Sequence, residues 1–119
     1  MLRSVNKHNG IPAYIQIINM IKSEIILGRL KPGDQIPPVR KLKEIFDVNI
    51  NTVLKALDKL RTEGILDSEQ GIGFFINKNL NINSEAVKEI EMCVKKLKEL
   101  EIDLQTLFII FEEVWKNVY

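Results

Sequence analysis

Cysteine and histidine are almost absent from this chain of 119 residues, which contains one of each. The single Cys93 excludes an internal disulfide framework and a multi-cysteine zinc site. The single His8 lies far from it in the sequence, so we expect neither a histidine-rich metal site nor a catalytic triad. We therefore expect no metal and no cofactor, and we interpret Cys93 as a buried structural thiol rather than a redox sensor.

Long apolar segments and a strong charge of either sign are also missing. The longest unbroken apolar run is Leu107–Phe111, whereas a membrane-spanning helix needs about 20 apolar residues. No basic segment followed by a long apolar stretch opens the sequence, as a signal peptide would require. We therefore expect a cytoplasmic protein with no membrane partner. The net charge is only +1, so no strongly basic tail argues for nucleic-acid binding.

The chain does have an uneven charge distribution around an asparagine-rich connector. Residues 1–77 contain 11 Lys/Arg and 8 Asp/Glu, whereas residues 78–119 contain 6 and 8. Four of the seven residues in 77–83 are asparagine, which favours turns over regular backbone pairing. The sequence therefore predicts a domain in residues 1–77 and a tail in residues 78–119.

Three helices are predicted in the first part by apolar residues that recur every three or four positions. The first helix follows Pro12 and ends near Gly28, and the second follows Pro38. The third follows Asn49, a good N-cap residue, and ends near Gly64. The apolar faces of the three helices are Tyr14, Ile17, Ile18, Ile21 and Ile25, then Val39, Leu42, Ile45 and Phe46, then Val53, Ala56, Leu57 and Leu60.

After the third helix the pattern changes to that of a small β-hairpin. Ile65 and Leu66 form one extended segment, Phe74–Ile76 forms the returning one, and Gly71 and Gly73 lie in the turn between them. The order helix, helix, short turn, helix, hairpin predicts a mostly α fold with a small hairpin, namely a winged helix-turn-helix. On topology alone, a small helical domain without a DNA partner fits the pattern equally well.

Several motifs follow one another in residues 12–76. Gly28–Asp34 reads GRLKPGD, Ile36–Leu42 reads IPPVRKL, Val48–Val53 reads VNINTV and Gly71–Ile76 reads GIGFFI. In this order the motifs resemble those of the GntR family of bacterial transcription regulators. The VNINTV form and the short tail look like the YtrA-like subgroup, in which two helices replace a ligand-binding domain. The resemblance implies a DNA-binding repressor, often one acting on a nearby transporter operon.

The resemblance also implies which residues contact DNA. In the family, an Arg at the position of Arg40 contacts the DNA backbone or a base edge. An Asn such as Asn51 can read an adenine edge, and a Lys such as Lys55 can bind a phosphate or a guanine. The candidate DNA-binding residues are Arg40, Asn49, Ile50, Asn51, Thr52, Lys55, Gly71 and Gly73.

Each candidate has an alternative structural role. Arg40 could pair with Glu44 one helical turn away, and Asn51 and Lys55 could form a solvated helix face. Thr52 could serve the cap of the third helix, and the two wing glycines could be turn residues only.

Three positions depart from the family pattern. Many members carry Arg at the positions of Ile50 and Leu54, and neither apolar side chain can form the same hydrogen bonds. Ile50 can contact a thymine methyl group instead, so we expect different bases to be read. Pro38 replaces a Ser and removes a hydroxyl and an N–H from an expected phosphate contact.

The tail is predicted to form two helices. Ser84 is the expected N-cap of the first helix, and Asp103 is the expected N-cap of the second. The apolar face of the second helix is too wide for one antiparallel neighbour to cover, and exposed it would favour association. Packing against the first domain is one solution. We expect instead that a second copy of the chain covers it, through Val94, Leu97, Leu104, Phe108, Phe111 and Trp115.

The sequence thus favours a sequence-specific transcription repressor that binds an inverted-repeat operator in double-stranded DNA as a homodimer. The alternative is a protein-interaction adaptor that reuses a winged-helix fold and docks through its tail. We do not expect an enzyme, because the sequence contains no paired carboxylates in a cleft-like context, no nucleophile with a base and no phosphate-binding glycine loop. Nothing in the sequence identifies a small-molecule effector.

Overall fold

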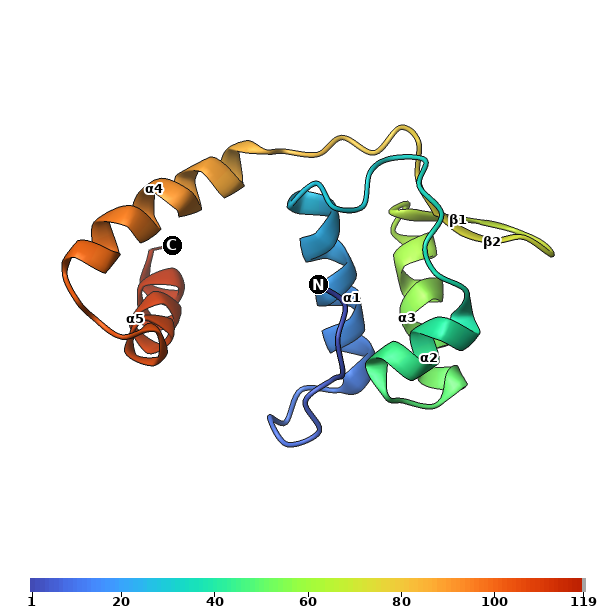
Figure 1. Ribbon diagram of the computed structural model, residues 1–119, viewed down its shortest axis with the longest axis horizontal. Helices are drawn as coiled ribbons and strands as arrows, with labels where there is room; N and C mark the ends of the chain where they lie inside the picture. Colours follow the sequence, from blue (N-terminus) through green and yellow to red (C-terminus); the bar gives the residue numbers. More distant parts are fainter. Residues whose placement is uncertain (119) are drawn as a thin grey trace. The chain divides into compact units, whose positions relative to one another are not determined.

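The computed structural model describes residues 1–118, which form five helices and one two-stranded antiparallel sheet (Figure 1). The elements are α1 (Ala13–Ile26), α2 (Val39–Phe46), α3 (Ile50–Thr62), β1 (Leu66–Glu69), β2 (Gly73–Ile76), α4 (Glu85–Glu99) and α5 (Leu104–Asn117). The chain divides into two compact units, one from Met1 to Ser84 and the other from Glu85 onward. This architecture confirms the predicted mostly α fold with a small hairpin.

Helix α3 is the centre of the first unit, because α1, α2 and β1 all pack against it. Every residue predicted for its inward face is fully buried. On the predicted inward faces of α1 and α2, Tyr14, Val39 and Ile45 are only partly buried. The side chains with 0% or 1% exposure are Ile17, Ile21, Leu42, Phe46, Val53, Ala56, Leu57, Leu60, Leu66 and Ile76. Leu80 and Ile82 of the asparagine-rich segment pack partly buried against this core, which extends the first unit beyond the hairpin.

A tight turn between α2 and α3 sets the angle of the helix-turn-helix. Asp47 ends α2 in the left-handed conformation, with φ of 54°. Two residues later, the Asn49 side-chain oxygen accepts a hydrogen bond from the backbone N–H of Thr52 at 3.0 Å. The predicted N-cap is therefore formed, and it satisfies one of the open N–H groups at the start of α3.

The hairpin is held by a third extended segment, residues 33–36, beside β2. Ile36 N–H donates to the carbonyl of Phe74 at 3.0 Å, and Ile76 N–H donates to that of Asp34 at 2.8 Å. A two-stranded hairpin is marginal by itself, so these bonds anchor it to the helices. β1 begins at Leu66, so the predicted Ile65 lies outside it, and it extends to Glu69 because its polar residues pair along the whole length of β2.

The second unit contains α4 and α5, and neither helix has a buried residue in the described chain. Asp103 occupies the predicted N-cap position of α5, but its side chain forms no capping hydrogen bond. The prediction that Cys93 is buried was wrong, because this thiol is exposed on α4. No helix within residues 1–118 is long and apolar enough to cross a membrane.

Candidate nucleic-acid interface

The outward side of α3 carries the central candidate residues. Ile50, Asn51, Leu54 and Lys55 are exposed, whereas Val53 between them is fully buried. In a helix, positions i, i+1, i+4 and i+5 share one side, so these four side chains form a single surface near the N-terminal end of α3. This end is the part of a recognition helix that contacts base edges in the major groove.

Lys55 is oriented by an aromatic ring from another helix. Its ammonium nitrogen lies 4.0 Å from the centre of the Tyr14 ring at the start of α1. This cation–π contact places the Lys55 charge beside the outward face of α3. The sequence pattern assigned Tyr14 only to the apolar face of α1, and no spacing signal linked it to a residue 41 positions later.

Asn49 and Thr52 both take part in the cap of α3. Besides the backbone bond, the Thr52 hydroxyl donates to the Asn49 side-chain oxygen at 3.2 Å. The alternative structural role of Thr52 is therefore realised. The cap uses the Asn49 oxygen and leaves its side-chain NH₂ group as a donor at an exposed position.

Arg40 is exposed in the first turn of α2. Its suggested pairing with Glu44 is not formed, since the ion pairs of residues 1–118 join other residues. The Arg40 guanidinium thus lies at the N-terminal end of a helix without an internal carboxylate partner. That arrangement suits contact with a phosphate or a base edge.

The tip of the hairpin carries the two glycines predicted for a wing, with Gly71 in the turn and Gly73 at the start of β2. Gly73 has a φ of 140°, and a Cβ added there would lie 3.0 Å from Nε2 of Gln35. That same Nε2 donates to the carbonyl of Ile72 at 3.0 Å, so Gln35 fixes the turn from the segment that precedes α2. Sequence reasoning missed Gln35, because its partner lies 37 residues away.

The helix-turn-helix has an excess of positive charge. Residues 39–62 contain six Lys/Arg and three Asp/Glu. Two of these carboxylates are already paired, Asp47 with Lys7 at 3.0 Å and Asp58 with Arg61 at 2.7 Å. The remaining cations favour a polyanionic partner, although the whole chain is almost neutral. Among residues 1–118, no group of three His, Cys, Asp or Glu side chains could hold a metal ion.

Comparison with known proteins places this arrangement in a family. The family model of bacterial regulatory proteins, gntR family, matches residues 13–76, which run from α1 to the end of β2. The chain belongs to the GntR family. The HTH-type transcriptional repressor YtrA of Bacillus subtilis (strain 168) is 37% identical over 99 residues, covering 83% of this chain and 75% of that protein. This GntR protein is thus a DNA-binding transcription regulator of the YtrA-like kind, and not an enzyme, as predicted.

Solved structures agree with this assignment. The DNA-binding domain of AraR in complex with operator ORX1 is 32% identical, covers 64% of this chain and 92% of that chain, and has a TM-score of 0.55. YtrA from Sulfolobus acidocaldarius, a GntR-family transcription factor, covers 97% of both chains with a TM-score of 0.58. At 23% identity, the second likeness concerns the fold alone. Other curated relatives are longer, and this chain spans 42% and 31% of two of them.

Proposed function

We propose that this GntR regulator is a homodimeric repressor that binds an inverted-repeat operator in the cytoplasm. The observation that carries the proposal is the exposed apolar surface of the second unit, joined to a unit that has its own core and a DNA-binding fold. Residues 1–77 would bind the operator and residues 78–119 would join the two copies. A nearby transporter operon is the proposed target, on the family resemblance alone.

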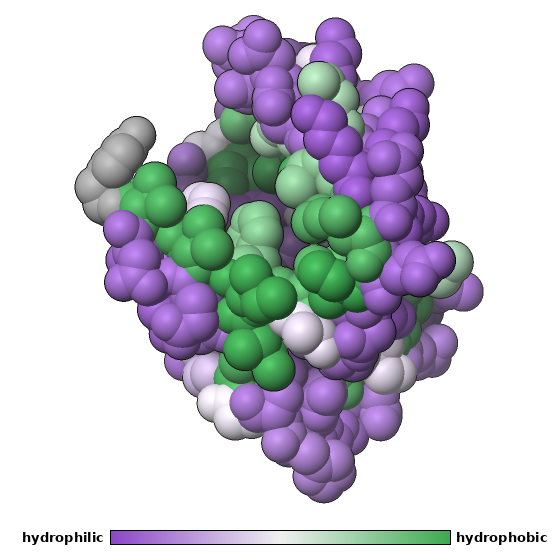
Figure 2. Space-filling model, turned by 90° about the vertical axis from the view of Figure 1, so that its left-hand side faces the viewer, coloured by the Kyte–Doolittle hydropathy of each residue, from purple (hydrophilic) through white to green (hydrophobic). Residues whose placement is uncertain are grey.

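The proposed dimerisation surface lies on α4 and α5. Figure 2 shows apolar residues gathered on the surface of these helices. On α5, Phe108, Phe111 and Trp115 are 57%, 62% and 74% exposed. A large apolar side chain contributes about 1.5–3 kcal/mol when it is fully buried, so covering this surface with a second copy would be strongly favourable. The proposed contact residues are Val94, Leu97, Leu104, Phe108, Phe111 and Trp115.

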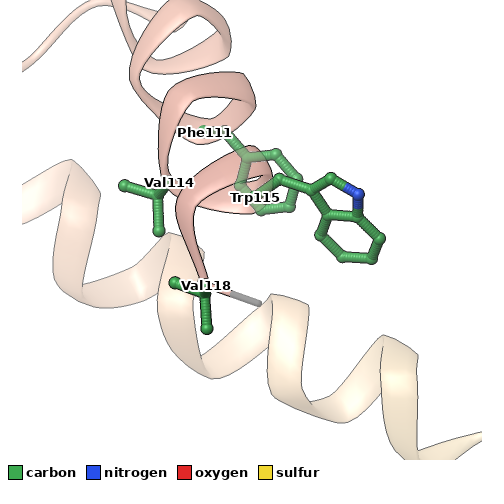
Figure 3. A pocket seen from close by; sticks show the side chains of 4 residues that line it. All are labelled: Phe111, Val114, Trp115 and Val118. Carbon is green, nitrogen blue, oxygen red and sulfur yellow. The ribbon is translucent and has the colours of Figure 1, made fainter.

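The C-terminal half of α5 provides the most prominent part of this surface. Phe111 and Trp115 stack with ring centroids 6.1 Å apart. Together with Val114 and Val118 they line an open apolar hollow (Figure 3). Aromatic side chains that offer large apolar areas from a rigid helix are typical anchors of protein interfaces.

Operator recognition follows from the symmetry of such a dimer. Two copies related by a two-fold axis present two α3 helices to successive major grooves, about 34–36 Å apart. The bound sequence would therefore be an inverted repeat. The residues proposed to contact each half-site are Arg40, Asn49, Ile50, Asn51, Thr52, Lys55, Gly71 and Gly73.

The experiment that tests the proposal is selection of bound duplexes from a randomised pool by the full chain, together with sedimentation of the free protein. We expect an inverted repeat from selection and a dimer at micromolar concentration. The double variant Phe111→Ser, Trp115→Ser should sediment as a monomer, whereas Glu113→Ser on the same helix should remain a dimer. A monomeric wild type, or a pool without symmetry or sequence preference, would contradict the proposal and favour a protein-interaction adaptor.

A further inference from the structure

Two exposed aliphatic side chains stand out on the outward side of α3. Ile50 is 45% exposed and Leu54 is 41% exposed, whereas the apolar residues on the inward side of the same helix are fully buried. The exposed pair is one helical turn apart and lies beside Asn51 and Lys55. The core of the first unit does not need either side chain, so their apolar character calls for another explanation.

The surroundings of the pair indicate what covers it. The helix-turn-helix around Ile50 and Leu54 carries six Lys/Arg against three Asp/Glu, and Asp58, the next residue along that side of α3, is paired with Arg61. Charged residues are depleted at the centre of protein–protein interfaces, whereas cations surround a nucleic-acid interface. The charge therefore favours double-stranded DNA over a second protein as the occupant.

The major groove offers one apolar group to such a surface. Among the base edges in that groove, only thymine presents a methyl group, and the other positions are hydrogen-bond donors and acceptors. Neither Ile50 nor Leu54 can form a hydrogen bond, so neither can distinguish bases through donors and acceptors. Packing against a methyl group is the sequence-dependent contact that remains for them.

We propose that Ile50 and Leu54 read the methyl groups of two neighbouring thymines in each operator half-site. The inference rests on the proposed entry of α3 into the major groove, and it makes Leu54 a specificity-determining residue. Residues four apart in a helix are separated by about 6 Å along its axis, which corresponds to about two base-pair steps. The two thymines should therefore lie within about two steps of each other, and Asn51 can bind the adenine of an adjacent pair.

The test uses the operator obtained by selection and the full chain. Replacing one of the two thymines by uracil removes the methyl group and nothing else. We expect an affinity loss of about four-fold for one methyl and about fifteen-fold for both, by the free energy of burying one carbon. Uracil at a thymine outside the half-sites is the matched control and should change nothing. Replacing the T·A pair by 5-methylcytosine·G should weaken binding less than replacing it by cytosine·G.

Two variants connect the effect to the side chains. Each side chain is expected to contact one of the two thymines. Leu54→Ala should therefore lose its sensitivity to uracil at the thymine that Leu54 contacts, and Ile50→Ala should lose it at the other thymine. Both side chains are exposed, so thermal unfolding should stay close to that of the wild type. If the wild type binds a symmetric operator specifically, and binds its uracil-substituted form with the same affinity, the inference is overturned and the proposed function stands. If no specific operator exists, both fall together.

Discussion

Helices α1 and α5 have the same length of 14 residues, but only α1 has its apolar face buried within its own unit. α1 buries Ile17, Ile18, Ile21 and Ile25 against the core of the first unit. α5 is also rich in aliphatic and aromatic residues, and it has no buried residue in the described chain. Apolar content alone therefore does not make a core, and the number of neighbours decides how much of a helix can be covered.

The arrangement of apolar residues accounts for the difference. In α1 they form a stripe every three to four positions, which the rest of the first unit can cover. In α5, Ile109, Ile110 and Val114 widen the stripe around the helix, and they are 67%, 45% and 54% exposed. A helix that is apolar on most of its circumference needs several neighbours, and within residues 85–118 the second unit supplies only α4. The first unit covers its own apolar residues, whereas the second leaves its apolar residues exposed, as the proposed association requires.

Removal of the second unit should produce the largest effect. A chain that ends at Ser84 retains every core residue of the first unit, so we expect it to fold by itself and to unfold cooperatively. It should bind the selected operator about 100- to 10,000-fold more weakly, because two linked half-site contacts become one. Circular dichroism during heating and operator titration are the two measurements.

A matched control is a duplex with a single half-site. The shortened and full chains should bind it with similar affinity, since only one first unit can engage. Similar binding of the complete operator by both chains would show that the second unit does not join two copies on DNA.

Truncation of one phenylalanine in each unit should separate stability from association. Phe46 is fully buried, so Phe46→Ala should lower the free energy of unfolding by about 3–5 kcal/mol. Phe108 is 57% exposed, so Phe108→Ala should leave the unfolding of the first unit unchanged within about 0.5 kcal/mol and weaken dimerisation instead.

The single tryptophan makes the two effects observable in one experiment. Trp115 lies in α5, so its fluorescence reports the second unit, while circular dichroism reports all helices. During denaturant unfolding, the fluorescence midpoint should depend on protein concentration, and Phe108→Ala should lower it. A fluorescence midpoint that is independent of concentration, in both the wild type and the variant, would contradict association through α5.

The same contrast explains what the sequence could predict. Local signals were sufficient for the first unit: Asn49 caps α3, and the spacing of Val53, Ala56, Leu57 and Leu60 identified its inward face. Contacts between distant residues carry no such signal, so the Tyr14–Lys55 and Gln35–Ile72 contacts were not foreseen.

Cys93 was predicted wrongly for a different reason. The lack of a second cysteine or a nearby histidine suggested a structural thiol, and a structural thiol was expected to be buried, but no residue of α4 is buried within the described chain. A pattern of apolar residues indicates which side of a helix is to be covered, and it does not indicate whether the cover lies in the same chain.

Two side-chain deletions in the first unit should separate phosphate contact from base recognition, and a deletion in the second unit is their control. Arg40→Ala should weaken binding to all DNA and lower the salt slope by about one unit, because a phosphate contact carries no sequence information. Asn51→Ala should cost about 1–3 kcal/mol on the selected operator and little on scrambled DNA. Lys95→Ala on α4 is the control and should change neither affinity. Affinity at several salt concentrations measures all three, and wild-type binding by both first-unit variants would refute the proposed interface.

Removing the N-cap side chain should destabilise α3 more than α5, and both losses should be smaller than those described above. The Asn49 side chain accepts the Thr52 N–H at 3.0 Å, whereas Asp103 forms no side-chain cap. Asn49→Ala should therefore lower the free energy of unfolding by about 1 kcal/mol, measured without DNA. Asp103→Ala should lose only the attraction of its charge to the helix dipole, a few tenths of a kcal/mol in salt. Equal losses would mean that the two caps are formed equally in solution.

The smallest effect should appear in acid, where one carboxylate of each unit has a lowered pKa. The N-terminal amino group, and then Arg29, hydrogen-bond Glu24 and hold its pKa below the ordinary 4.5 despite burial. Lys116, at 2.8 Å, lowers the pKa of the fully exposed Glu112. A lowered native pKa stabilises the folded chain above pH 4.5, and this contribution is lost as the pH falls through the native value.

Only the buried carboxylate should make this loss visible, because salt and water screen the exposed pair. On acidification from pH 5 to about pH 3, Glu24→Gln should therefore lose less thermal stability than the wild type, since it has no charge at this position to neutralise. Glu112→Gln should follow the wild-type curve at physiological ionic strength. Melting temperatures of the three proteins across this range test the comparison. If the melting temperatures of the wild type and Glu24→Gln fell in parallel with pH, protonation of Glu24, the first unit's one buried carboxylate, would not contribute to the acid dependence of stability.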